Sequence, residues 1–470
     1  MTVSRVLIAN RGEIAVRIIQ ACQALAIETV VAVSDADRDS AAAHMAGRAV
    51  CIGPARAADS YLNVGAIIAA ALGTGADAVH PGYGFLAESP RFAEACAAEG
   101  LTFIGPTPLQ IREMGNKLQA RALARECGVP LLNGSEEVRT ADEAAAVADR
   151  LGFPMMLKAA AGGGGRGIKI ALDHQSIGQI FSSAAAEARS AFGDDTLYLE
   201  KYITNARHVE VQVLGDRFGN IVHLGERDCS LQRRHQKMVE EAPALEISSA
   251  LRQEIRDAAV TLGRKIGYEN AGTVEFLVDQ ETKSFYFLEM NTRIQVEHPV
   301  TEMITGIDLV QEQLRVARGE RLRFVQSDVT FRGHAIECRI NAESPEEGFR
   351  PHPGRIVTWL PPQGPNIRLD THCYAGYTVP MFYDSMLGKL IVYGSDRTEA
   401  VERMRRAVEQ FVIVGIPSTL PFLQFVMSHA SFVAGHVNTR LVDQMIPQML
   451  AQSKVREDRS NQSSDKQAAP

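Results

Sequence analysis

Cysteine, tryptophan and long apolar runs are scarce in this sequence of 470 residues. The seven cysteines are scattered and never occur in CxxC spacing, which is typical of a reducing cytosol rather than a disulfide framework or zinc site. The opening segment MTVSRVLIAN has one arginine and a short apolar run, so we expect neither a signal peptide nor a membrane span. A net charge of −7 disfavours a general nucleic-acid binder but is compatible with a local cationic pocket. These absences predict a cytoplasmic protein that binds neither nucleic acid nor membrane.

The length and composition indicate an α/β chain of about three domains. Near the N-terminus, RVLIAN, RGEIAVRIIQACQALA and ETVVAVS predict a strand, a helix and a strand. The first turn lacks GxGxxG, which disfavours a nicotinamide dinucleotide site. Changes of pattern predict a first domain over residues 1–114, a second over 115–330 and a strand-rich third over 331–446. Residues 447–470 are mostly polar, and we predict a disordered tail there.

The glycine-rich segment AAAGGGGRGIKI, with glycines from Gly162 to Gly167, has two interpretations. Such runs are often flexible linkers. This one lies between two predicted strands, the first of which contains Lys158, and glycines let backbone amides approach phosphate oxygens. The Walker pattern GxxxxGK followed by Ser or Thr is absent from the sequence, so a nucleotide held here would belong to another ATP-binding architecture.

The segment GTVEFLVDQETKSFYFLEMN predicts a β-hairpin with two facing carboxylates. Folding it about Thr282 places Glu275 directly across from Glu289. Like charges across a sheet are destabilising, and a hard divalent cation bound by both carboxylates would compensate them. Asn291 supplies a further oxygen. The alternatives are a solvated polar face and a register shifted by a β-bulge.

The same strand continues into a row of polar residues at every second position. In FLEMNTRIQVEHPVTE this row is Glu289, Asn291, Arg293, Gln295 and Glu297, which a strand would present on one face. An arginine fork beside an amide suits a planar anion such as bicarbonate. Glu297 would then act as the base that removes the bicarbonate proton.

Further segments repeat this pattern. RHVEVQV and IECRIN alternate polar and apolar residues, and their polar faces are His208, Glu210, Gln212, Glu337, Arg339 and Asn341. The segment QRRHQK, residues 232–237, adds cations that suit phosphate and bicarbonate. Cationic segments of this kind are more often solvated or bind nucleic acid.

Together these stretches resemble biotin carboxylase of the ATP-grasp superfamily, over roughly residues 3–445. The motifs that carry the similarity are, in order, IANRGEIA, HPGYGFLAE, MGNK, KAAAGGGGRGI, EKYI, RHVEVQV, ERDCSLQRRHQK, GTVEFL, EMNTRIQVEHPVTE, ECRINAE and YAGYTVPMFYDSMLGKLI. The resemblance implies a ligase that carboxylates biotin. Bicarbonate attacks the γ-phosphate of ATP, carboxyphosphate breaks down to carbon dioxide and phosphate, and the ureido nitrogen of biotin captures the carbon.

The resemblance also implies roles for residues at matching positions. The residues implied to hold ATP are Lys117, Lys158, Gly163, Gly164, Gly165, His208, Gln232 and His235, with Glu200, Lys201 and Ile203 around the adenine. Two magnesium or manganese ions would be held by Glu275, Glu289 and Asn291. Bicarbonate would be bound by Lys237, Arg293, Gln295 and the Val296 backbone, and deprotonated by Glu297. Arg339 would stabilise the biotin enolate, and Tyr83 and Gly84 would lie near the biotin ring.

For the fold, the resemblance implies an N-terminal doubly wound domain, a central ATP-grasp domain and a C-terminal biotin carboxylase domain. A glycine-rich subdomain over about residues 132–203 would close on the site as a mobile lid and protect carboxyphosphate from water. Two positions depart from the family pattern. Asn116 in MGNK stands where Asp is usual, and His352 in FRPHPG stands where Ser is frequent, which affects expectations for nucleotide affinity and local packing.

Partners follow from the resemblance as well. The sequence has no Met-Lys-Met biotin-anchoring segment, and we expect no carrier or carboxyltransferase domain after residue 445. A separate biotin carboxyl carrier protein and separate carboxyltransferase subunits are therefore expected, and the family is commonly homodimeric. The favoured pathway is the first half-reaction of acetyl-CoA carboxylase, which yields malonyl-CoA for fatty acid synthesis. The alternatives are a subunit of another acyl-CoA or pyruvate carboxylase, a different ATP-grasp carboxylate-amine ligase, and a regulatory or scaffold subunit.

Overall fold

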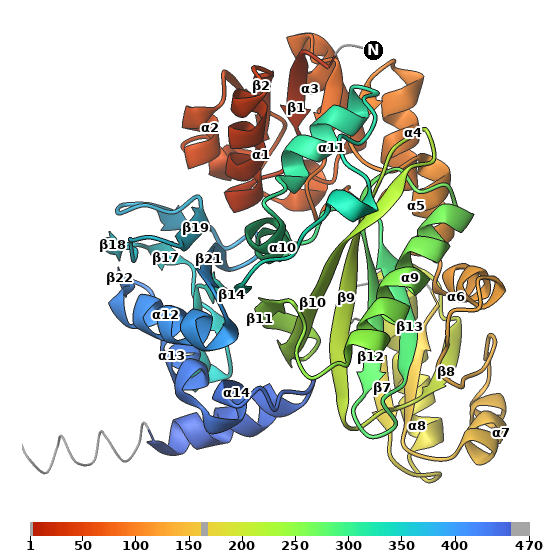
Figure 1. Cartoon of the computed structure of the whole chain (residues 1–470). Helices are drawn as coiled ribbons and strands as arrows, with labels where there is room; N and C mark the ends of the chain where they lie inside the picture. The colour runs from red at the N-terminus through yellow and green to blue at the C-terminus, as the bar shows by residue number, and fades with distance from the viewer. Residues whose placement is uncertain (1–2, 161–167, 453–470) are drawn as a thin grey trace, which may run out of the picture.

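The computed structural model describes residues 3–160 and 168–452 of the chain. Three parts pack together in Figure 1: an N-terminal part in red and orange, a central part in yellow and green, and a C-terminal part in blue. The predicted three-part α/β architecture is confirmed. Among the described residues, no helix combines the length and the apolar character needed to cross a bilayer.

A five-stranded parallel sheet forms the N-terminal part, in the order β3-β2-β1-β4-β5. The chain begins in the middle strand and adds strands on both sides, which is the predicted doubly wound arrangement. Its strands are short and apolar because helices cover both faces. The bounds are β1 Arg5–Ile8, α1 Gly12–Ala24, β2 Glu28–Val33, η1 Asp35–Asp37, α2 Ala41–Met45, β3 Arg48–Cys51, η2 Ala57–Asp59, α3 Val64–Thr74, β4 Ala78–His80, α4 Pro90–Ala98, β5 Thr102–Phe103 and α5 Pro108–Gly115.

A small antiparallel sheet in the order β7-β6-β8, with two helices, lies at one end of the central part (Figure 1). Its bounds are α7 Ala141–Leu151, β6 Met155–Ala159, β7 Ile168–Ala171, α8 Ile177–Phe192 and β8 Leu197–Lys201. The two strands predicted to flank the glycine run are thus β6 and β7. The run itself, with Gly163, Gly164 and Gly165, lies outside the described residues.

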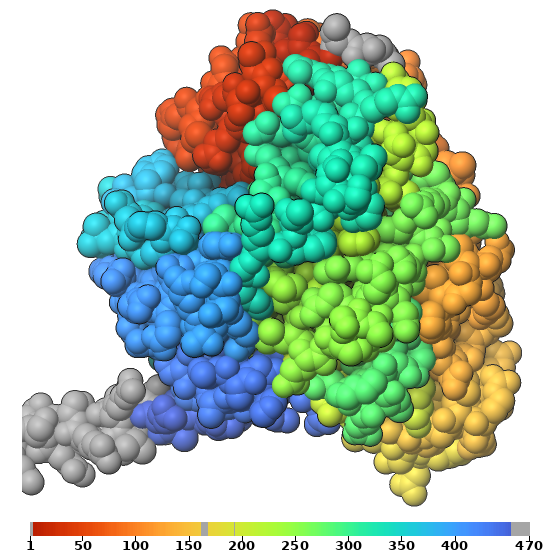
Figure 2. All heavy atoms as spheres, in the orientation of Figure 1, coloured from red at the N-terminus to blue at the C-terminus, as the bar shows by residue number. Residues whose placement is uncertain are grey.

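An eight-stranded sheet in the order β13-β12-β9-β10-β11-β14-β21-β19 joins the central and C-terminal parts. The central elements are α6 Lys117–Glu126, β9 Ala206–Gly215, β10 Ile221–Arg233, β11 Gln236–Ala242, α9 Ser249–Lys265, β12 Asn270–Asp279, β13 Phe285–Asn291, α10 His298–Thr305, α11 Leu309–Ala317 and η3 Gln326–Asp328. Helix α11 packs on α1 of the N-terminal part, and in Figure 2 the teal segment lies directly against the red one.

The C-terminal part supplies β14, β21 and β19 to that sheet. Its bounds are β14 His334–Asn341, β15 Glu343–Ser344, η4 Pro345–Glu347, β16 Arg350–Pro351, β17 Gly354–Arg355, β18 Thr358–Leu360, β19 Ile367–Thr371, β20 Thr378–Val379, β21 Met386–Gly394, α12 Arg397–Gln410, β22 Val412–Val414, α13 Leu420–Ser428 and α14 Ala430–Val433.

The predicted start of the disordered tail is wrong. Residues 441–452 are helical, so residues 447–452 belong to a helix. Met445 and Met449 are buried in the C-terminal core, and Ile446 and Leu450 pack against it. Apolar residues at helical spacing continue past residue 447 and pack on the core, so the helix extends into the segment whose polar composition had suggested disorder. Residues 453–470 of the predicted tail lie outside the described residues.

Candidate active site

The hairpin β12–β13 places its two carboxylates opposite each other, as predicted. Glu275 pairs in register with Glu289, and Thr273 pairs with Asn291. The pairs nearer the turn, from Phe276–Phe287 to Val278–Phe285, would by themselves place Glu275 opposite Leu288. A β-bulge after Glu275 shifts the register by one residue and makes the two carboxylates face each other. The predicted pair is therefore correct, but the bulge produces it rather than a regular fold about Thr282.

The expectation of one continuous strand through Glu297 is wrong. Strand β13 ends at Asn291, and residues 292–297 form an irregular segment that leads into α10. Pro299 lies in the first turn of that helix, a position where proline is favoured. The side chains of Arg293, Gln295 and Glu297 still lie together at the site. Hydrogen bonds and ion pairs, such as those from Arg293 to Gln295 and from Gln295 to Glu275, fix their positions instead of the alternation of a strand.

A cavity of about 920 Å³ opens beside these elements. Most of the predicted residues line it: Tyr83, Gly84, Lys117, Lys158, Lys201, Ile203, His208, Gln232, His235, Lys237, Glu275, Glu289, Asn291, Arg293, Gln295, Val296 and Arg339. Glu200 and Glu297 do not line the cavity and are buried behind it. The structure therefore brings residues from all three parts of the chain to one cavity.

Lys237 is the central cation of the site. Its Nζ lies 2.5 Å from Glu210 Oε2, 2.8 Å from Glu275 Oε1 and 2.6 Å from Glu297 Oε1. Burial would lower the pKa of this ammonium, but the surrounding carboxylates raise it well above its usual value. Lys237 is thus held as a cation against the predicted base.

Glu297 is fully buried between two cations. Arg339 Nη2 donates to Glu297 Oε2 at 2.8 Å, on the side opposite Lys237, and Arg339 Nε donates to Glu240 Oε1 at 2.6 Å. Burial would raise the pKa of Glu297, but Lys237 and Arg339 hold it well below its ordinary value. The carboxylate is therefore ionised at neutral pH.

Arg293 is held by four acceptors, one of which is the Ile294 carbonyl, to which its Nη1 donates at 3.2 Å. Its Nη1 also donates to Gln295 Oε1 at 2.9 Å, its Nη2 to Asn291 Oδ1 at 3.1 Å and its Nε to Glu88 Oε2 at 3.0 Å. Gln295 Nε2 donates to Glu275 Oε1 at 3.2 Å. This network orients a guanidinium and an amide at the cavity wall, as binding of a planar anion requires.

At the other end of the cavity, lysines lie beside an apolar surface. Lys117 Nζ is 3.7 Å from Glu289 Oε2, and Lys158 Nζ is 2.5 Å from Glu200 Oε2. Glu200 also accepts from the buried Arg121, so its side chain serves these cations. The apolar lining consists of Leu132, Met156, Ile168, Ile170, Ile203, Leu277 and Leu288. An apolar slot next to lysines suits a base with attached phosphates.

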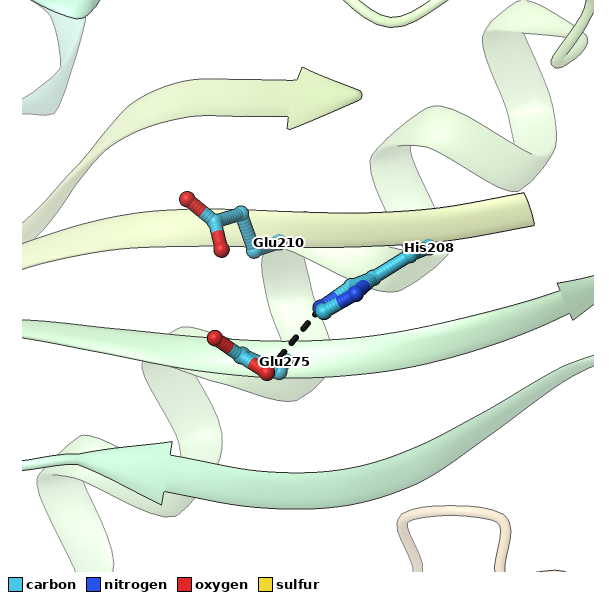
Figure 3. Close-up of side chains that lie close together, drawn as sticks. All are labelled: His208, Glu210 and Glu275. Carbon is cyan, nitrogen blue, oxygen red and sulfur yellow. Dashed lines mark ion pairs between the residues drawn. The ribbon is translucent and has the colours of Figure 1, made fainter. Parts of the chain in front are cut away.

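Side chains that could hold a cation are gathered around Glu275. The side chains His208, Glu210 and Glu275 have ligand atoms within 4.8 Å of one another, and His208 Nε2 is 2.9 Å from Glu275 Oε2 (Figure 3). The predicted set of Glu275, Glu289 and Asn291 offers hard oxygens, which magnesium prefers. The residues present therefore fit magnesium.

Several residues at the site were not singled out in the sequence as functional. Glu13 accepts a hydrogen bond from the Tyr83 hydroxyl, and Glu210, noted only as part of a polar row, forms a buried pair with Arg227 at 2.5 Å. Thr439, Arg440 and Asp443 also line the cavity. The alternation of polar and apolar residues in RHVEVQV could have identified Glu210 as a site residue. No comparable pattern in the sequence marks Thr439, Arg440 or Asp443.

The two departures from the family pattern have local partners. Asn116 Oδ1 accepts from the Gln119 backbone N–H at 3.0 Å and so caps α6, a role that Asn and Asp fill equally well. His352 Nε2 is 3.2 Å from Glu347 Oε2. All seven cysteines have free thiols.

Comparisons with known proteins decide the family. The biotin carboxylase N-terminal domain matches residues 2–111, the ATP-binding domain of the carbamoyl-phosphate synthase L chain matches 116–325, and the biotin carboxylase C-terminal domain matches 337–444. Biotin carboxylase of Nostoc is 51% identical over 446 residues, which cover 95% of this chain and all of that protein. The chain belongs to the biotin carboxylase family. It is an ATP-dependent ligase, as the resemblance implied.

Other relatives of this chain belong to different biotin-dependent carboxylases. A pyruvate carboxylase subunit of Methanothermobacter thermautotrophicus is 48% identical over 94% of this chain and 90% of its own length. A biotin carboxylase from Campylobacter jejuni, solved with β,γ-ATP, matches with a TM-score of 0.92 and 44% identity, over 94% of this chain and 99% of that one. The biotin carboxylase domain of Hydrogenobacter thermophilus 2-oxoglutarate carboxylase, solved as a dimer with MgADP, ADP and bicarbonate, has a TM-score of 0.92 and 46% identity, over 95% and 98%.

Proposed function

We propose that this biotin carboxylase carries out the first half-reaction of acetyl-CoA carboxylase, on biotin attached to a separate carrier protein. Separate carboxyltransferase subunits then transfer the carboxyl group and yield malonyl-CoA for fatty acid synthesis. The chain works as a homodimer in the cytoplasm. Two ions, magnesium or manganese, would be held by Glu275, Glu289 and Asn291 and would offset the phosphate charge.

The observation that carries the catalytic assignment is the row Lys237–Glu297–Arg339, in which the two half-buried cations line the cavity and pair with the buried Glu297 carboxylate between them. Lys237, Arg293, Gln295 and the Val296 backbone hold bicarbonate, and the Glu297 carboxylate takes its proton. The bicarbonate oxygen then attacks the γ-phosphorus of ATP. The P–O bond to ADP breaks, and carboxyphosphate forms.

The second step uses the same wall. The C–O bond of carboxyphosphate breaks to give carbon dioxide and phosphate. The phosphate takes the proton of the biotin ureido N–H, and the nitrogen forms its bond to the carbon of carbon dioxide. Arg339 faces the negative charge that develops on the ureido oxygen, and it is already oriented by Glu240 and Glu297. Tyr83 and Gly84 border the biotin ring. At the opposite end, Lys117, Lys158, His208, Gln232, His235 and the glycine run bind the phosphates, with Lys201 and Ile203 near the adenine.

Release of ADP by the purified chain, with and without bicarbonate and free biotin, tests this function. We expect hydrolysis that depends on bicarbonate and rises with biotin. Hydrolysis that requires an amine and ignores bicarbonate would instead indicate a carboxylate-amine ligase. ATP binding without turnover would indicate a regulatory subunit.

The acceptor needs its own experiment, because relatives include subunits of pyruvate and 2-oxoglutarate carboxylases. Labelled bicarbonate is supplied with the carrier and carboxyltransferase of the same organism. Acetyl-CoA, propionyl-CoA, pyruvate and 2-oxoglutarate are then compared as acceptors. We expect label in malonyl-CoA, and label only in another product would assign the chain to that carboxylase.

A further inference from the structure

A fully buried lysine, Lys389, links the candidate site to the N-terminal part. It belongs to β21 and is 0% exposed. Its Nζ donates to the Val296 carbonyl at 2.8 Å and lies 3.3 Å from Glu13 Oε1. Asp370 Oδ2 is 4.0 Å away on the neighbouring strand β19. A buried ammonium requires oxygen partners, and these three come from three separate segments.

The contact with Val296 acts on the base. The Val296 carbonyl belongs to the peptide that joins Val296 to Glu297, in the irregular segment between β13 and α10. With no strand pairing in this segment, the ammonium of Lys389 fixes the plane of that peptide. The orientation of Glu297 and of the Val296 backbone therefore depends on Lys389.

The contact with Glu13 acts on the other wall of the cavity. Glu13 lies in the first turn of α1, and its Oε1 accepts both from Lys389 and from the Tyr83 hydroxyl. Glu13, Tyr83 and Val296 all line the cavity, whereas Lys389 lies behind them. A continuous chain of polar contacts thus runs from the Val296 carbonyl to the Tyr83 hydroxyl.

We propose that Lys389 is a positioning residue that aligns the bicarbonate end of the cavity with its biotin end. It does so by holding the Val296–Glu297 peptide and, through Glu13, the Tyr83 side chain. The inference rests on the proposed function, because the roles of Val296, Glu297 and Tyr83 come from it. No part of Lys389 itself reaches the cavity.

The first test replaces the ammonium with an apolar chain of similar length, Lys389→Met. We expect the KM for bicarbonate to rise on the order of tenfold or more, because a displaced peptide misplaces the anion site and the base. The KM for ATP stays within about twofold, since the polar partners of Lys389 among the described residues are Val296, Glu13 and Asp370, none of which belongs to the nucleotide end. The fraction of ATP hydrolysis that yields carboxybiotin also falls.

A purely structural lysine would change thermal stability without this split between the two KM values. The double variant Glu13→Gln/Lys389→Met removes both buried charges and keeps the shape, so it folds even if the single variant does not. It should show the same split. The matched control is Arg252→Met, on α9. Arg252 forms an ion pair with the buried Glu226 and donates to the Ala244 carbonyl at 2.9 Å, so the control also removes a cation from a buried partner. That control should lower the melting temperature and leave both KM values unchanged.

Tyr83→Phe tests the far end of the chain of contacts in a protein that keeps its lysine. We expect a lower yield of carboxybiotin per ATP, with unchanged KM values for bicarbonate and ATP. Parallel changes of all KM values in the lysine variants, or an unchanged yield in Tyr83→Phe, would overturn the inference. A wild-type chain without bicarbonate-dependent hydrolysis would instead overturn the proposed function.

Discussion

At the residue scale, the site is a set of carboxylates and cations that are buried together. Glu297 has Lys237 on one side and Arg339 on the other, so its charge depends on both. The sequence analysis selected these three side chains, and the structure brings them together as predicted. They meet through ion pairs and not because they alternate along one strand. Lys237 meets carboxylates from β9, β12 and the segment before α10, and contacts between elements so distant in sequence were beyond prediction from a local pattern.

Arg339→Ala should separate the two steps of the reaction. Carboxybiotin formation should fall about 10²- to 10³-fold, the usual effect of removing one donor that faces developing negative charge. Bicarbonate-dependent ATP hydrolysis should keep much of its rate, because Glu297 retains Lys237 at 2.6 Å. The measurement compares ADP release with carboxybiotin yield. Arg403→Ala, a half-buried arginine on α12 outside the cavity, serves as control, and an equal loss of both rates would contradict the assignment.

Glu297→Gln should abolish both activities together. The amide has nearly the same shape but accepts no proton, so carboxyphosphate does not form, and a loss of about 10²- to 10⁴-fold is expected. Steady-state ADP release and carboxybiotin yield measure the effect. Nucleotide affinity, followed by titration calorimetry, should be unchanged because Glu297 pairs with Lys237 and Arg339 and not with the lysines at the nucleotide end. Retained bicarbonate-dependent hydrolysis in this variant would mean that another group is the base.

At the scale of elements, local and distant pairings differ in how far the sequence determines them. The β12–β13 hairpin was predicted from two strands adjacent in sequence, but the pairing of its two carboxylates depends on a bulge after Glu275. The neighbours of β11 are β10, which directly precedes it, and β14, which follows some 90 residues later. The pairing of β11 with β10 can be predicted, because the two strands are adjacent in sequence. The pairing with β14 cannot, because it depends on contacts between distant segments, such as those of Glu241 on β11 with His334 on β14 and Arg397 on α12.

Glu241 is predicted to stabilise the junction of β11, β14 and α12. Its carboxylate accepts from His334 at 2.8 Å and from Arg397 at 2.8 Å. Burial alone would raise its pKa, but these partners lower the pKa from 4.5 to about 2. The folded state therefore gains stability above pH 4.5, and that gain is lost as the pH falls from 4.5 towards 2.

Glu241→Gln should accordingly cost about 3 kcal/mol at neutral pH. The melting temperatures of wild type and variant, compared at pH 7 and near pH 3, measure the effect. Their difference should shrink at the lower pH, because Glu241 of the unfolded wild-type chain binds a proton there, whereas in the folded state it stays ionised down to about pH 2. Glu409→Gln, at an exposed end of α12, should change stability by less than about 0.5 kcal/mol at either pH. A gap that stays constant with pH would mean that Glu241 stabilises by packing alone.

At the scale of the whole molecule, the three parts share their cores. Leu309 and Leu314 of α11 pack in one hydrophobic cluster with Val6 and Ile14 of the N-terminal part. The eight-stranded sheet passes through the predicted boundary at residue 330. Composition and strand signals were sufficient to predict three parts, but they carry no information on which strands of different parts pair. The boundaries at 114 and 330 remain predictions.

A chain cut at the predicted boundary should reveal this shared sheet. The fragment 331–452 would expose the edge of β14. In the full chain, Ala335 to Cys338 of this edge pair with Ala242 to Val239 of β11. The cut would also expose Glu337, which is buried in the full chain, to water. Unpaired strand edges of this kind favour aggregation over folding. We expect the fragment to show no cooperative thermal transition by circular dichroism, whereas co-expression with residues 1–330 restores one. A fragment that melts cooperatively near the temperature of the full chain would show that the C-terminal part folds independently and only docks its strands onto β11.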